Sequence, residues 1–105
     1  MIFFKTGVEF KAVEPVLLRG MADMADLWSQ RFPNVPFTVT SVNDGTHLVT
    51  SWHYKGRAFD FRTHEVPSQG AASVILDYRA YHPEWVVLFE AKGTPSEHGH
   101  AQVPG

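Results

Sequence analysis

The sequence lacks cysteine entirely, although it is 105 residues long. Disulfide bonds and thiolate metal ligands are therefore excluded, so any metal site must use histidines and carboxylates. The chain also lacks a run of about 20 apolar residues, the length that a membrane-spanning helix needs. The short apolar start at residues 1–5 is no signal-peptide core. By default we expect a protein kept in the cytoplasm, with no membrane partner.

Concentrated positive charge is missing as well. The formal net charge is -2, and the lysines and arginines are scattered along the chain. Since contacts to a phosphate backbone need a basic surface, we expect no nucleic-acid partner. The length and the hydrophobic content of 44% fit one domain over residues 1–105, with a single core and a monomeric state.

Hydrophobic periodicity predicts two helices and several strands. Apolar residues recur at steps of three and four over residues 14–32, with Met21, Met24 and Trp28 as core positions, and a second helix is expected over residues 67–81. Residues 2–10 read as a strand or an extended arm. Further β-type runs cover residues 36–42, 48–54, 57–62, 85–89 and 98–103, the run at 85–89 being typical of a central buried strand. This order predicts an α+β fold, a small mostly antiparallel sheet under one layer of two main helices.

A turn at Lys55-Gly56 would join two of these runs into a hairpin. In that hairpin Ser51 faces Asp60, so that alternation places Ser51, His53 and Asp60 on one face and aromatic residues on the other. Imidazole and carboxylate are good zinc ligands, and a catalytic zinc usually takes three protein groups and a water molecule. The third ligand would come from residues 98–100, where the pattern alone does not choose between His98 and His100.

Residues 51–60 read SWHYKGRAFD and resemble the pattern Ser-x-His-x-x-Gly-x-Ala-x-Asp of the zinc D,D-peptidase superfamily. That superfamily includes D-alanyl-D-alanine carboxypeptidases, phage L-alanyl-D-glutamate endopeptidases and, more distantly, the Hedgehog signalling domain. The likeness extends over residues 36–103. His47 stands six residues before His53, as in Hedgehog domains, and residues 85–90 and 98–100 look like their Trp-Val to Glu and His-x-His segments.

The resemblance implies a Hedgehog/D,D-peptidase-like fold in which His53, Asp60 and His100 hold one zinc ion. It also implies that Glu90 is the general base, with Glu97 as the alternative because it stands three residues before His100. Around these groups, His47, Ser51 and His98 would contact the substrate or the metal ligands, and the guanidinium of Arg57 could bind a substrate carboxylate.

The activity implied is zinc-dependent hydrolysis of peptide bonds in bacterial peptidoglycan, by a D,D- or L,D-type carboxypeptidase or endopeptidase. Its partner would be a peptidoglycan stem peptide or a similar short peptide. A phage lysis enzyme, or endolysin, that reaches the cell wall through lysis or is carried in a virion fits this expectation. The alternative is a non-enzymatic, zinc-binding Hedgehog-like module or a structural component of a virion.

Overall fold

The structure, a computed structural model, describes residues 2–9, 13–42 and 56–103. The predicted β-type run at residues 48–54 lies outside the described residues. So do three of the predicted site residues, His47, Ser51 and His53.

Both predicted helices are confirmed. Helix α1 spans Pro15–Arg31, with Pro15 in the first turn, where its missing N–H leaves no intrahelical hydrogen bond unmade. Helix α2 spans Ser68–Tyr81 and ends where the backbone N–H of His82 donates to the carbonyl of Tyr78, directly before Pro83. One face of each helix is buried, and Tyr81, the last residue of α2, is 73% exposed.

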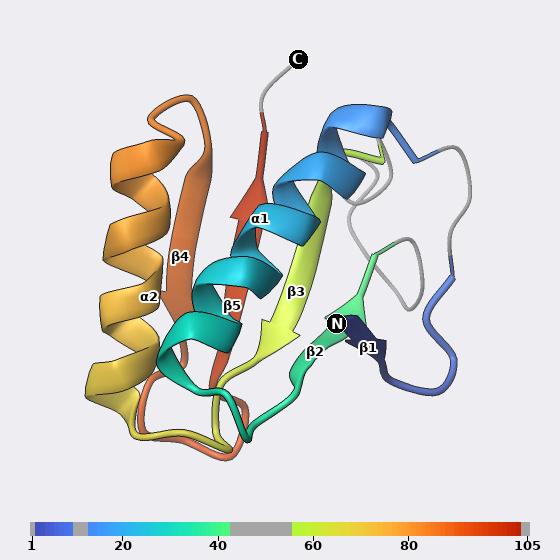
Figure 1. Cartoon of the computed structure of the whole chain (residues 1–105). Coiled ribbons are helices and arrows are strands. Elements are labelled where there is room, and N and C mark those ends of the chain that lie inside the picture. The colour runs from blue at the N-terminus through green and yellow to red at the C-terminus, as the bar shows by residue number, and fades with distance from the viewer. Residues whose placement is uncertain (1, 10–12, 43–55, 104–105) are drawn as a thin grey trace.

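Within the described residues, five strands form one mixed sheet. They are β1 (Ile2–Phe4), β2 (Phe37–Ser41), β3 (Ala58–Arg62), β4 (Val86–Glu90) and β5 (His98–Gln102). Their order across the sheet is β1-β2-β3-β5-β4, with β1 parallel to β2 and every other neighbouring pair antiparallel. Figure 1 shows both helices on the same side of the sheet. The α+β class with two helices on a largely antiparallel sheet is therefore confirmed.

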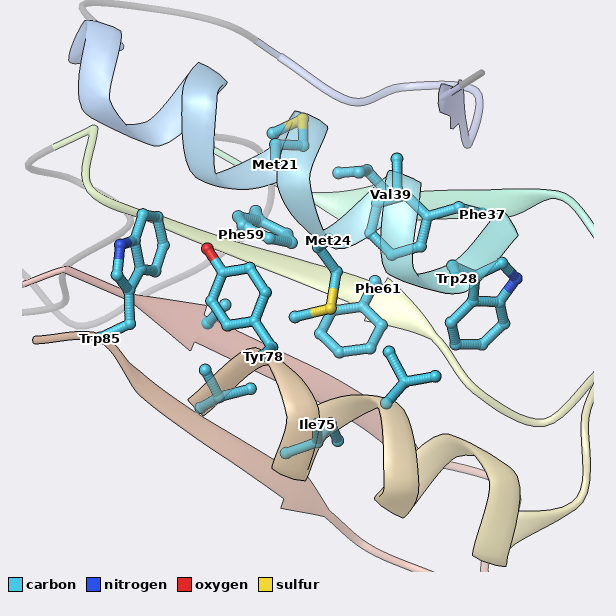
Figure 2. Close-up of a cluster of buried hydrophobic side chains, with 14 of the residues drawn as sticks. Met21, Met24, Trp28, Phe37, Val39, Phe59, Phe61, Ile75, Tyr78 and Trp85 are labelled. Carbon is cyan, nitrogen blue, oxygen red and sulfur yellow. The ribbon is translucent and has the colours of Figure 1, made fainter. Parts of the chain in front are cut away.

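A single apolar core fills the space between the helices and the sheet. Its largest members come from both layers, as Figure 2 shows: Met21, Met24, Trp28, Ile75 and Tyr78 from the helices, and Phe37, Val39, Phe59 and Phe61 from the strands. The predicted stripe of Met21, Met24 and Trp28 is confirmed as core. Burying these large side chains supplies the main favourable free energy for holding the layers together.

The strand β5 approaches the core closely at Gly99. A Cβ atom built on Gly99 would lie 2.1 Å from Cζ of Phe61, so the aromatic ring packs directly over the glycine backbone. Gly99 and Phe61 are also paired across β3 and β5. The small residue between two histidines therefore makes room for a core ring on one face of the sheet while its neighbours point to the other.

One prediction about the strands is wrong. The run that forms β4 lies at the end of the strand order β1-β2-β3-β5-β4 and not in its centre, and alternate residues Val86 and Leu88 are 39% and 43% exposed on the face opposite α1 and α2. The predicted pairing of Asp60 with Ser51 involves a residue outside the described ranges; Asp60 itself lies between Ser41 of β2 and His100 of β5. The alternation itself holds, since Asp60 points away from the core that contains Phe59 and Phe61.

Candidate metal centre

The face of the sheet opposite the helices collects polar side chains. Along β5, Gly99 and Ala101 are buried toward the core, whereas His98, His100 and Gln102 alternate with them and are half-buried. On the neighbouring strand β3, the side chain of Asp60 points to this same face, because Phe59 and Phe61 on either side of it point into the core. The register pairs Asp60 directly with His100, so the two side chains emerge side by side.

Asp60 and His100 are in direct contact. Oδ1 of Asp60 lies 2.7 Å from Nδ1 of His100, and the two side chains are only 18% and 13% exposed. Burial lowers the pKa of His100, but its ring hydrogen bonds to Asp60 and Gln102 and the nearby carboxylate charges outweigh burial, so this pKa lies above its usual value. When Nδ1 carries a hydrogen, the ring donates it to the carboxylate of Asp60.

Gln102 holds the other end of the His100 ring. Its Oε1 atom lies 2.7 Å from Nε2 of His100. Sequence reasoning missed this residue, although a strand places residues two apart on one face, and that spacing was the signal that could have found it.

Glu90 and His98 form a second, more exposed pair on the same face. They are paired across β4 and β5, and Oε1 of Glu90 lies 3.5 Å from Nε2 of His98. Nδ1 of His98 is also 2.8 Å from the carbonyl oxygen of Ser96. Leu88 is the partner of His100 on β4. Glu90 lies two residues further along the same strand, so it is diagonal to the Asp60–His100 pair.

Glu97 lies apart from this polar face. It precedes β5 and has the parity of the core-facing residues, and its side chain is buried. Its carboxylate accepts hydrogen bonds from Thr63 Oγ1 at 2.8 Å, Ser68 Oγ at 2.8 Å and the backbone N–H of Gly93 at 3.2 Å. Burial raises the pKa of Glu97, but these donors outweigh it and hold the pKa below its usual value.

Arg57 contacts the end of the chain segment that follows β5. Its Nε–H donates to the carbonyl oxygen of Val103 over 2.8 Å, and the backbone N–H of Val103 donates to the carbonyl oxygen of Arg57. This guanidinium therefore helps to fix the segment behind Gln102. The Nε–H of Arg57 is therefore already used in a hydrogen bond within the protein.

The donor chemistry of Asp60 and His100 fits a zinc ion. Zinc with ligand distances of about 2.0 to 2.1 Å and tetrahedral geometry places neighbouring donor atoms roughly 3.3 Å apart. The Nδ1 and Oδ1 atoms, now 2.7 Å apart, would separate by about half an ångström to admit the ion. Within residues 2–9, 13–42 and 56–103, no group of three His, Cys, Asp or Glu residues converges, and the third expected ligand, His53, lies outside these ranges.

Comparisons with known proteins leave the family open. The sequence matches no protein-family model, and no curated protein is significantly similar to it. Among the described helices, none has the length and apolar character required to cross a membrane.

Proposed function

We propose that this chain is a zinc-dependent peptidase that hydrolyses peptide bonds of bacterial peptidoglycan. The contact between Asp60 and His100 is the observation that carries the proposal. These residues are 40 positions apart in the sequence, yet their donor atoms lie 2.7 Å apart on the face of the sheet opposite the helices. They are also two of the three ligands that the resemblance to the zinc D,D-peptidase superfamily implies.

In this proposal His53, Asp60 and His100 hold one zinc ion in a domain of the Hedgehog/D,D-peptidase type. A bound zinc ion would polarise the scissile carbonyl group and lower the pKa of a water molecule toward neutrality. Two of these ligands, Asp60 and His100, lie on the hydrogen-bonded strands β3 and β5, whose mutual position is fixed by five residue pairs. Such a rigid support favours metal binding because little conformational freedom is lost when the ion enters.

Glu90 is our candidate for the general base. It lies on the same face as Asp60 and His100, it is partly exposed, and its negative charge is close enough to affect His100. Glu97 fits this role less well because its carboxylate is buried and accepts hydrogen bonds from three donors. A base must reach the proton that it abstracts, and Glu90 has the freedom to do so.

The proposed substrate is a stem peptide of peptidoglycan, and the proposed biological setting is phage-mediated lysis or a virion. The face of the sheet opposite the helices offers both polar and apolar contacts around the Asp60–His100 pair. Val86 and Leu88 present apolar surface on β4, next to the His98–Glu90 pair. An extended peptide could therefore meet hydrogen-bonding groups and apolar side chains at one site.

Metal analysis and peptidoglycan digestion of the same purified protein test this proposal. We expect one zinc ion per chain and release of peptide fragments, which mass spectrometry would assign to a cleaved bond. Asp60→Ala and His100→Ala should lose zinc and hydrolysis together, whereas Asp26→Ala, a matched change at an exposed residue of α1, should keep both. Full hydrolysis by a metal-free preparation would contradict the proposal. Zinc binding without any hydrolysis would favour the non-enzymatic module.

A further inference from the structure

We propose that Gln102 is a positioning residue that fixes the His100 ring and selects Nδ1 as its metal-binding nitrogen. The inference rests on the proposed zinc site and extends it to a residue that is no ligand itself. Its basis is a row of three side chains, Asp60, His100 and Gln102, joined by two hydrogen bonds of 2.7 Å each.

The two hydrogen bonds leave the ring one orientation. Nδ1 of His100 faces Oδ1 of Asp60 on the neighbouring strand, and Nε2 faces Oε1 of Gln102, two residues along the same strand. A half-turn of the imidazole about its bond to Cβ would remove both nitrogens from these oxygens. Because the ring is largely buried, such a turn would leave polar atoms without partners, which is unfavourable in the interior of a protein.

The chemistry of the amide oxygen then decides which nitrogen is available. A side-chain carbonyl oxygen accepts hydrogen bonds and does not donate them, so Nε2 must carry its hydrogen to make the observed contact. A protonated nitrogen has no free electron pair for a metal. Binding of a zinc ion at Nδ1 would therefore release the proton between Nδ1 and Asp60 to solvent, while Nε2 would keep its hydrogen and go on donating it to Gln102. Metal-binding histidines commonly donate their second ring N–H in this way.

The register gives Gln102 little else to bind. Its partners across the sheet are Ala58 on β3 and Val86 on β4, and neither has a side chain that forms hydrogen bonds. Among the described residues, the hydrogen bond of the Gln102 side chain is the one to His100. An apolar residue of similar size would fill the same space on the sheet but would make no hydrogen bond. We therefore assign the role of the Gln102 amide to its hydrogen bond with His100.

Nuclear magnetic resonance of the ¹⁵N-labelled, metal-free protein tests the positioning directly. The Nε2–H signal of His100, identified by its loss in His100→Gln, should be protected from solvent exchange at slightly acidic pH. After addition of zinc alone, this signal should persist while Nδ1 shows the shift of a metal-bound nitrogen. Gln102→Met should lose the protected signal and weaken zinc binding by roughly 10- to 100-fold.

Two further variants separate positioning from mere packing. Gln102→Glu keeps an acceptor oxygen beside Nε2, so it should retain the protected signal and bind zinc at least as tightly as the parent protein. Gln69→Met makes the same chemical change at an exposed position of α2 and should alter neither measurement. If Gln102→Met fails to fold, the Glu variant still decides, because a folded Gln102→Glu protein without the signal would overturn the inference.

The measurements also distinguish failure of this inference from failure of the proposed function. Zinc bound through Nε2, or a Gln102→Met protein that equals the parent in both measurements, would refute the role of Gln102 and leave the zinc site standing. A protected Nε2–H in a parent protein that binds no zinc would refute the metal function and the selection of Nδ1. In that case only the fixed orientation of the ring would remain.

Discussion

Oγ1 of Thr63 donates a 2.8 Å hydrogen bond to the buried carboxylate of Glu97, joining the residue after β3 to the residue before β5. Glu97 also accepts hydrogen bonds from Ser68, the first residue of α2, and from Gly93 in the loop after β4. Four segments of the chain therefore meet at one carboxylate. Since β3 carries Asp60 and β5 carries His100, this cluster stabilises the register that brings the candidate ligands together.

Thr63→Val should destabilise the protein by about 1 to 3 kcal/mol, because it removes a donor from a buried carboxylate while keeping the side-chain shape. Equilibrium unfolding in urea at neutral pH would measure the free energy of unfolding. Thr6→Val, the same change at an exposed position near the N-terminus, serves as the control and should change stability by less than about 0.5 kcal/mol. Equal stability of the two variants would show that the Glu97 cluster contributes little.

Acid should weaken the fold through Glu97. The pKa of Glu97 lies below its usual value in the folded protein because Ser68, Thr63 and Gly93 donate hydrogen bonds to it, so folding favours the charged carboxylate. The resulting stabilisation is complete at pH values above the unfolded pKa and is lost as the pH falls through the folded pKa. Stability measured from pH 6 down to pH 2 should therefore decline less steeply in Glu97→Gln than in the parent protein. Parallel curves would contradict this role for Glu97.

Much of the fold could be predicted because its signals are local. The steps of three and four that place Met21, Met24 and Trp28 on one face identify α1, and alternation around Asp60 identifies which face of β3 is buried. The order of the strands could not be predicted in the same way. Residues 86–90 are apolar enough for a central strand, yet they lie at the end of the strand order, since that order depends on long-range pairing that composition does not record.

The candidate site was only partly predictable for a related reason. Asp60 and His100 were identified by motif, and their contact follows from the pairing of β3 with β5, which the sequence did not reveal. Glu97 stands three residues before His100, and this odd spacing along an extended chain directs its carboxylate to the opposite face, toward Thr63. Gln102 was missed because a neutral amide carries no chemical signal by itself.

Gly99→Ala should destabilise the protein through overpacking. The added Cβ atom would lie 2.1 Å from Cζ of Phe61, so the ring or the strand must move within a filled core, at a cost of about 1 to 3 kcal/mol or more. Thermal and urea unfolding would measure the loss. In a Phe61→Leu background the same change should be less destabilising, because the atom that causes the clash is gone. Additive effects of the two substitutions would argue against this contact as the cause.

Glu90→Gln should separate metal binding from hydrolysis. Glu90 is no ligand in the proposed site, so the variant should bind zinc with an affinity similar to that of the parent protein. Loss of a general base typically slows a reaction by about 10²- to 10⁴-fold, and we expect peptidoglycan hydrolysis to fall within that range. Glu84→Gln, a matched change at an exposed residue before β4, should leave both properties unchanged.

Hydrolysis at the parent rate in Glu90→Gln would exclude Glu90 as the base. Because Glu97 is buried among its own donors, that result would direct attention to His98, the neighbour of Glu90 on the same face.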